Sequence, residues 1–238
     1  LILSSQSYGE VIKVFEFTES ELSNLEEKKV RGAKNKTIFS IGNNENGNFL
    51  KAVSSNGGSG IGKEINIDLE KTPFLNITWK VEQGLSGIDE RSKKGHDFAA
   101  RMFVVKKTGA TPLSNRAINF VFSSNEDIGQ FWPGPYFSKS IDYVLSSTKE
   151  NSNEWVSAKA NVKELFKQLH DLDLRNLDGV ALMADTDNSK LNSVAYYQNI
   201  FFFSRINYIL NFFFNITEKR DNNTAITTSS KGESPYVD

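Results

Sequence analysis

Hydrophobic and polar positions alternate in short runs along most of the chain, and the runs recur at intervals of roughly ten residues. Turns rich in Gly and Asn separate these runs. The first predicted strand covers residues 11–17. The later ones cover residues 37–41, 48–55, 61–69, 74–81, 97–107, 117–123, 143–147, 155–160, 178–184 and 194–203. Many short strands at this spacing are typical of a β-sandwich or a β-barrel.

Two segments follow the period of a helix instead. Thr18 to Glu21 predicts a helix start, and residues 162–169 carry apolar side chains three and four positions apart. The polar segment 82–96 and the aromatic segment 131–137, which contains Pro and Gly, are predicted to be loops. The sequence therefore predicts an all-β fold with one or two short helices, a β-sandwich of jelly-roll or galactose-binding-like type.

Composition narrows the chemistry of any site. The 238 residues include no Cys, two His, 28 basic and 29 acidic residues, for a net charge of -1. A disulfide scaffold and a Cys-ligated metal are excluded. A nucleic acid is not an expected partner, because the chain has no surplus of positive charge. Any metal site must then be built mainly from oxygen atoms, and any acid–base pair is expected to be two carboxylates.

The ends of the chain predict how it is organised. Residues 1–9 resemble the end of a secretory signal peptide, because an apolar stub precedes small polar residues and the charged Glu10. We therefore expect a periplasmic or secreted protein. Residues 10–203 are expected to form the sandwich domain, and 204–238 an atypical, disordered tail. The apolar run at 206–214 is shorter than the ~20 residues of a transmembrane helix, so no membrane span is expected.

The segment Gly57 to Lys63 is rich in Gly and superficially resembles a phosphate-binding loop. It lacks the spacing of a P-loop, and no predicted helix follows it. We interpret it as the turn of a β-hairpin.

One polar cluster occurs where the loop at 82–96 enters a strand. Asp97, Ala99 and Arg101 share one face of that strand, because side chains alternate. Arg101 offers a planar set of donors and Asp97 could accept the hydroxyl groups of a sugar, which predicts a ligand pocket. The alternative is a structural ion pair or two solvated charges. His96, beside the cluster, is expected to be exposed.

A second polar cluster, Asp185-Thr186-Asp187-Asn188, follows the apolar strand at 178–184. Oxygen atoms of Asp185, Asp187 and Asn188 could ligate Ca²⁺, although the segment is not an EF-hand loop. The two acids could instead form a general acid–base pair. A third interpretation is a turn in which these side chains bond their own backbone.

Aromatic side chains are candidates for stacking on a sugar. Trp132 and Tyr136 lie in the predicted loop at 131–137 and are the preferred ligand-binding pair. Trp79 and Trp155 lie in predicted strands and are expected in the core.

Several segments together resemble the bacterial domain-of-unknown-function 3047 family, from about Val11 to Phe203. They are residues 49–54, 73–81, 97–105 and 181–188. The resemblance implies a sandwich fold and export, supplies no reaction, and supports Asp97, Arg101, Asp185, Asp187 and Asn188 as one shared polar site. The sequence departs from the family at 120–122, where a Tyr-x-Trp-like strand is expected, and after Phe203.

Three functions follow as hypotheses. The first is an exported protein that binds a glycan or cell-envelope polymer through the Asp/Arg site, with a cation such as Ca²⁺ held by the second cluster. The second is a glycan hydrolase that uses Asp97 with Asp185 or Asp187. The third is a structural envelope protein without a ligand.

Overall fold

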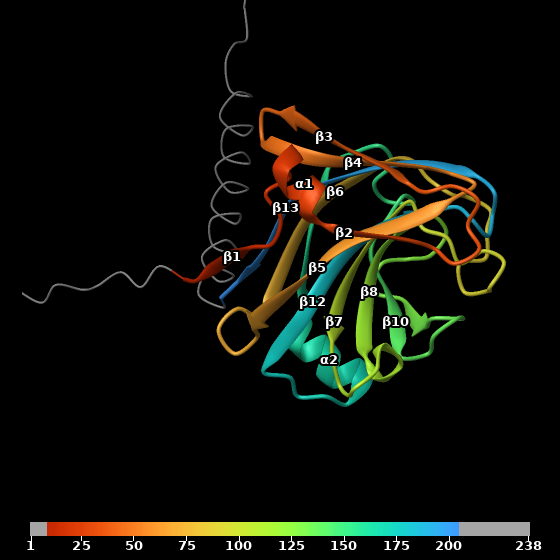
Figure 1. Cartoon of the computed structure of the whole chain (residues 1–238). Helices are drawn as coiled ribbons and strands as arrows, with labels where there is room; N and C mark the ends of the chain where they lie inside the picture. Colours follow the sequence, from red (N-terminus) through yellow and green to blue (C-terminus); the bar gives the residue numbers. More distant parts are fainter. Residues whose placement is uncertain (1–8, 205–238) are drawn as a thin grey trace, which may run out of the picture.

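A computed structural model describes residues 9–204, which form two β-sheets packed face to face (Figure 1). The elements in these residues are β1 (Val11–Lys13), α1 (Glu19–Asn24), β2 (Glu26–Lys29), β3 (Ile38–Asn44), β4 (Gly47–Ser55), β5 (Gly58–Asp68), β6 (Phe74–Gln83), β7 (Ala100–Lys106), a 3₁₀ turn (Pro112–Ser114), β8 (Arg116–Ser123), β9 (Phe131–Pro133), β10 (Ser140–Ser147), β11 (Val156–Asn161), α2 (Val162–His170), β12 (Asn176–Asp185) and β13 (Asn192–Phe203). The predicted β-sandwich is confirmed. The predicted signal peptide end and tail lie outside the described residues, apart from Gly9 and Ser204.

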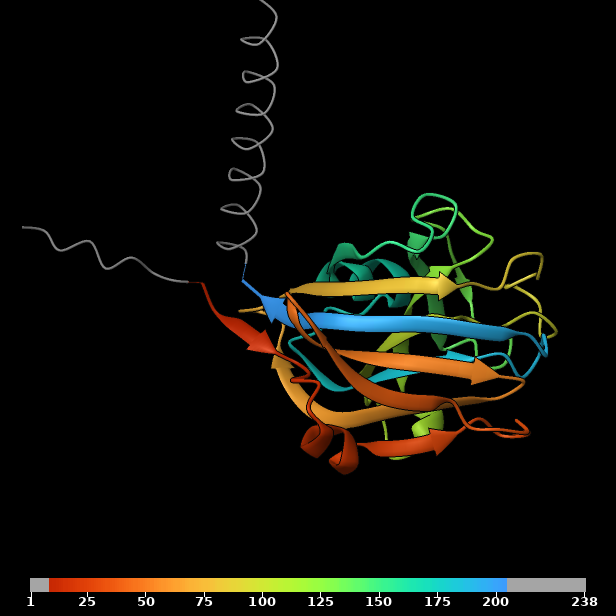
Figure 2. The same ribbon diagram turned by 90° about the horizontal axis from the view of Figure 1, so that it is seen from above.

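In the described part, sheet A has the order β11-β6-β13-β4-β3, and β1 pairs with β13. Sheet B has the order β2-β5-β12-β7-β8-β10-β9. The strand pairings in this part are antiparallel except for β8 with β10, which run parallel. Figure 2 shows the strands of sheet A side by side in the view from above.

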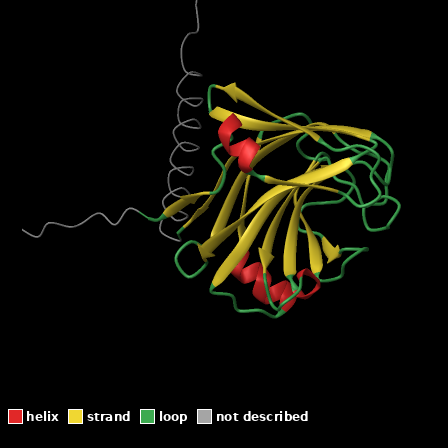
Figure 3. Ribbon diagram, in the orientation of Figure 1, coloured by secondary structure: helices red, strands yellow, loops and turns green. Residues whose placement is uncertain are grey.

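The two described α-helices begin as their sequences predict. The Thr18 hydroxyl accepts the Glu21 N–H at 3.1 Å, and the Asn161 side chain accepts the Glu164 N–H at 3.2 Å. Figure 3 shows how little of the fold is helical. No helix among residues 9–204 is long and apolar enough to cross a membrane.

Two local predictions are wrong. Residues 131–137 were expected to be a loop, but 131–133 form the edge strand β9. The turn at Gly57 does not close a hairpin, because β4 belongs to sheet A and β5 to sheet B. At this crossing Gly57 packs so closely on the backbone of Asn35 that a Cβ would lie 2.5 Å from the Asn35 carbonyl oxygen.

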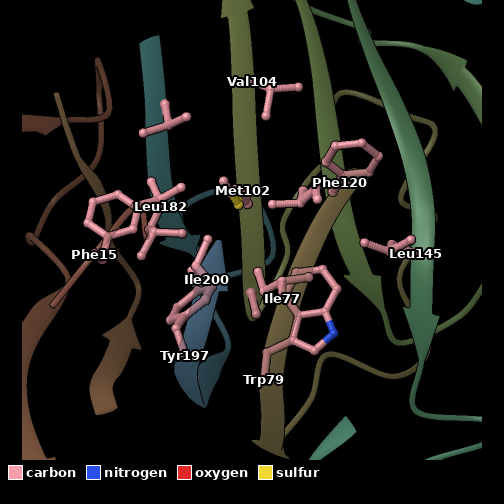
Figure 4. Close-up of a cluster of buried hydrophobic side chains, with 14 of the residues drawn as sticks. Phe15, Ile77, Trp79, Met102, Val104, Phe120, Leu145, Leu182, Tyr197 and Ile200 are labelled. Carbon is pink, nitrogen blue, oxygen red and sulfur yellow. The ribbon is translucent and has the colours of Figure 1, made fainter. Parts of the chain in front are cut away.

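The main core fills the space between the sheets (Figure 4). Trp79, in the core as predicted, and Tyr197 are both fully buried. The indole N–H of Trp79 donates to the Ser146 hydroxyl at 2.9 Å, and the Tyr197 hydroxyl donates to the Met183 carbonyl at 2.7 Å. Trp79 and Tyr197 therefore fill the core without leaving their polar atoms unpaired.

The loop between β6 and β7 packs on the outer face of sheet B. Phe98, at the end of this loop, forms a second small core with Val121, Trp132 and Val144. Earlier in the loop, the buried Glu90 carboxylate accepts the Ser124 N–H at 2.8 Å and also bonds the Ser123 hydroxyl. Burial raises the pKa of Glu90. These contacts bring the end of the loop against the polar residues that follow β12.

Candidate functional site

Arg101 on β7 and Asp185 at the end of β12 form a buried ion pair. The Arg101 Nε donates to Asp185 Oδ1 at 3.1 Å, and a terminal guanidinium nitrogen donates to Oδ2. Each residue is only 2% exposed. Burial lowers the pKa of Arg101, while the nearby carboxylates of Asp142 and Asp97 act in the opposite direction. The pair therefore joins two neighbouring strands on the outer face of sheet B.

Asp97 closes the turn that follows β12. Its fully buried carboxylate accepts the backbone N–H groups of Asn188 and Ser189, and Oδ1 accepts the Asn188 side-chain amide at 2.9 Å. In the opposite direction, Asp185 Oδ1 accepts the backbone N–H of Phe98, next to Asp97, at 3.0 Å. Each carboxylate thus holds the backbone of the other segment. The structure brings the two predicted clusters together, with carboxylate oxygens of Asp97, Asp185 and Asp187 within 4.8 Å of one another.

The oxygen atoms predicted to ligate a metal are mostly bonded to protein donors. Both Asp185 oxygens bond Arg101, and Asn188 Oδ1 accepts the Tyr136 hydroxyl at 2.6 Å. Asp187 Oδ1 is buried and has no hydrogen-bond partner among the described residues. Burial and the charge of Asp97 raise the pKa of Asp187. As arranged, these residues do not fit Ca²⁺, which takes six to eight oxygen ligands, and Arg101 already supplies the local positive charge.

The aromatic pair predicted in segment 131–137 is divided between two environments. Trp132 is 6% exposed, and the Arg91 guanidinium lies 4.7 Å from its ring centre. Its ring is therefore not open for stacking. Tyr136 is 59% exposed, and its hydroxyl oxygen also lies 2.8 Å from the Lys93 carbonyl oxygen, which shares the single hydroxyl proton with Asn188. Of this predicted pair, Tyr136 presents its ring to solvent beside the polar cluster.

A ligand contact by Asp97 or Arg101 remains a prediction. Both side chains are closed to solvent and bonded to the protein, so a ligand could reach them only if the 185–190 turn opened. The same burial leaves no space for a sugar between Asp97 and Asp185. The geometry therefore lends no support to a carboxylate-pair hydrolase.

Beside this cluster lie three side chains in contact, His96, Asp142 and Asn119, which the sequence does not predict to meet. His96, expected to be exposed, has a side chain only 12% exposed, and its Nε2 lies 2.7 Å from Asp142 Oδ2. Asp142 Oδ1 accepts the Asn119 side-chain amide at 2.6 Å. Asp142 and Asn119 are partners on β10 and β8. No spacing along the chain links these residues, because the contact depends on strand pairing.

A second unpredicted feature lies on the outer face of sheet A. Phe49 of β4, Tyr196 of β13 and Trp155, just before β11, form what we call the aromatic patch. Their ring centres are 5.6 to 5.9 Å apart. The core position expected for Trp155 is wrong, because this side chain is 37% exposed. It precedes an edge strand, and its ring contacts rings on the solvent side of the sheet rather than the core.

Glycine and lysine residues complete this surface. Gly42 on β3 is the strand partner of Phe49, and the Phe49 ring occupies the space that a side chain there would fill. Lys51 and Lys80 place their ammonium groups 5.6 and 5.5 Å from the centre of the Tyr196 ring. Figure 2 shows no described helix or loop crossing the middle of this face. Among residues 9–204, no further element covers the patch, in which Trp155 is exposed and Phe49 and Tyr196 are partly buried.

A comparison with known families identifies the chain. The sequence model described as "Protein of unknown function (DUF3047)" matches residues 23–201. The chain belongs to the DUF3047 family. The match spans both polar clusters and all three residues of the aromatic patch. No curated protein matches this DUF3047 chain.

Solved structures of similar shape include two carbohydrate-binding modules from Clostridium thermocellum. The family 11 module, solved with a β-1,3-1,4-mixed-linked tetrasaccharide, is 13% identical with a TM-score of 0.45, covering 82% of the DUF3047 chain and 96% of the module. The family 30 module of a cellulosomal cellulase is 8% identical with a TM-score of 0.48, covering 82% and 98%. A variant of the Rhodothermus marinus cellulase Cel12A is 10% identical with a TM-score of 0.41, covering 76% and 95%. Because these scores lie below 0.5, no functional inference follows from them.

Proposed function

We propose that this DUF3047 protein binds a glycan or a cell-envelope polymer through the aromatic patch. The observation that carries the proposal is a cluster of three aromatic rings on the outer face of sheet A, with polar and charged side chains beside it. Exposed aromatic clusters rimmed by polar groups mark interaction surfaces. A sugar ring suits such a surface, because its C–H face is apolar while its edge carries hydroxyl groups.

Polar groups on the same face suit those hydroxyl groups. Thr78 on β6 and Ser157 on β11 are strand partners whose hydroxyls lie 2.6 Å apart. Glu82, also on β6, accepts the Tyr196 hydroxyl at 2.6 Å. The face thus offers donors and acceptors next to Trp155, the most exposed ring of the patch. A few convergent polar groups beside aromatic rings are typical of specific ligand sites.

The polar cluster has a different part in this proposal. Asp97, Arg101 and Asp185 hold the loop end and the 185–190 turn in place, while Tyr136 offers one further exposed ring. The exported location predicted from residues 1–9 remains part of the proposal. It agrees with an extracellular polymer as the partner.

Replacing Trp155 by Ala tests the proposal. Affinity gel electrophoresis of the wild type against a panel of polysaccharides first identifies the polysaccharide that slows its migration most. For that polysaccharide we expect Trp155→Ala to lose affinity roughly tenfold or more, because truncation of a central aromatic contact costs about 2 kcal/mol. Phe131→Ala is the matched control, since Phe131 is 49% exposed but lies on β9 of sheet B.

Thermal melting of both variants checks that they are folded. Phe49→Ala provides a second truncation within the patch. Unchanged affinity in the folded Trp155→Ala and Phe49→Ala variants would exclude the patch as the binding surface. If the wild type binds no polysaccharide in the panel, the third hypothesis, a structural envelope protein without a ligand, is favoured.

A further inference from the structure

We infer that the aromatic patch binds a polysaccharide that carries carboxylate groups, a polymer of uronic acids, and that Lys51 and Lys80 hold these groups. The inference rests on the proposed function and adds the class of glycan. Its basis is the position of the two lysines on either side of Tyr196 and the lack of an ion pair to either of them among the described residues. It does not depend on the overall charge, which is -1 for the chain.

Both lysines lie in the middle of sheet A. Lys51 on β4 and Lys80 on β6 are the strand partners of Tyr196, one on each side of it. Both side chains are partly buried and cross the Tyr196 ring. An ammonium group has three donors, and a contact with a ring face leaves them available to oxygen atoms above the sheet. Two positive charges therefore flank a single ring at the centre of the patch.

The described part of the chain does not neutralise these charges by direct pairing. Ion pairs between a lysine and a carboxylate occur elsewhere in residues 9–204. None of them includes Lys51, Lys80 or Lys159, which lies nearby on β11. Glu82 is the acid that contacts the patch, and it is bonded to the Tyr196 hydroxyl. Burial and this contact raise the pKa of Tyr196 to about 12, so the hydroxyl stays protonated and adds no negative charge. Lys51, Lys80 and Lys159 outnumber Glu82 on this surface, so its local charge is positive and attracts anions.

The ring geometry favours a glycan over a single-stranded nucleic acid, which also combines aromatic rings with lysines. Proteins that bind single strands stack successive bases on successive exposed rings. Here the planes of the three rings are tilted by 56° to 74° relative to one another. Trp155 alone among them is more than one-third exposed. The patch thus offers one stacking surface with flanking charges, which suits one sugar ring whose neighbours carry carboxylates.

The test compares polygalacturonate with a neutral β-glucan of similar length, at about 50 mM and about 500 mM salt. We expect polygalacturonate to bind roughly tenfold more tightly at low salt and to lose that advantage at high salt, because ions screen the lysine charges. Lys51→Gln and Lys80→Gln should each weaken this binding about fivefold, the upper range for an exposed ion pair. Lys149→Gln is the control, since it removes the same charge from a pair with Asp127 that lies off the patch.

Each other result contradicts a defined part of the inference. Equal binding of the neutral glucan, with unchanged affinity in both lysine variants, would overturn the uronic acid assignment and leave the proposed function standing. Tighter binding of a sulfated dextran would overturn the choice of carboxylate, and tighter binding of oligothymidylate would replace the glycan by a nucleic acid. Absence of binding to every polysaccharide would remove the inference together with the proposed function.

Discussion

Arg101 and Asp185 bond each other through two contacts on neighbouring strands, and both are closed to solvent. Removing one partner of such a pair leaves an uncompensated buried charge, which costs about 3–5 kcal/mol. We therefore expect Asp185→Ala to lower the free energy of unfolding by about this amount in urea denaturation. Arg101→Met with Asp185→Leu should recover much of the loss, because no unpaired charge remains. A single variant as stable as the wild type would contradict this account.

Asp97 should contribute to stability by holding the turn after β12. Asp97→Asn keeps one acceptor oxygen but replaces the other by a donor that faces the Asn188 and Ser189 N–H groups. We expect a loss of about 1–3 kcal/mol in the free energy of unfolding, the cost of leaving a buried donor unsatisfied. Faster amide hydrogen exchange at residues 187–189 should accompany it.

Asp173→Asn is the control for this measurement, because the Asp173 side chain is 69% exposed. Equal stability of the two variants would show that the Asp97 contacts do not determine the turn. Lower glycan affinity in Asp97→Asn, with the turn still protected from exchange, would instead support the direct ligand contact predicted from the sequence.

Alternation of hydrophobic residues was sufficient to predict most of the sandwich. Strands such as β8 and β12 bury one face or both, so their apolar positions define them without knowledge of their partners. The boundary at Gly57 could not be predicted in this way. A tight turn looks the same in sequence whether the next strand pairs with the previous one or crosses to the other sheet.

In the candidate sites, too, local features could be predicted from the sequence and contacts between distant segments could not. Asp97 and Arg101 were recognisable as opposite charges close together in sequence, and Asp185 because it ends a buried strand. The predicted shared strand face is wrong, because β7 begins only at Ala100 and Asp97 lies in the loop before it. The aromatic patch was not recognisable, since its three residues are far apart in sequence and meet only through the order β11-β6-β13-β4. Trp155 in particular has the local pattern of a core residue. Its exposure follows from its place beside an edge strand.

His170 should make stability dependent on pH. Its Nε2 lies 3.0 Å from the Ala117 carbonyl, and its ring packs 5.4 Å from that of Phe166. Burial lowers the pKa of His170 below its ordinary value of 6.5, while the bond to Ala117 acts in the opposite direction. The folded state thus favours the neutral ring. Its contribution is present above pH 6.5 and is lost as the pH falls below that value, because the unfolded chain binds the proton more readily.

Melting temperatures of the wild type and His170→Gln between pH 7.5 and pH 5.5, a window on either side of about 6.5, measure this contribution. We expect the melting temperature of the wild type to fall further over this range than that of the variant. Parallel curves would show that His170 does not contribute to the acid sensitivity. The comparison of variant with wild type removes every contribution that the two proteins share.

Calcium should leave the melting temperature unchanged. Most oxygen atoms of the predicted ligands Asp185, Asp187 and Asn188 already accept hydrogen bonds from the protein, and the Arg101 guanidinium lies where a cation would bind Asp185. A ligand that bound only the folded state at about 100 times its dissociation constant would add about 2.7 kcal/mol of stability, which thermal melting detects easily. A rise that Asp187→Asn abolishes would restore the predicted calcium site and would require Arg101 to leave Asp185.

The stability of Asp187→Asn without calcium tests the same conclusion independently, because the pKa of Asp187 is raised in the folded state. Since the folded state holds its proton more tightly than the unfolded chain, Asp187→Asn should be neutral or stabilising at pH values above that pKa, whereas loss of a calcium ligand would make it destabilising when calcium is present.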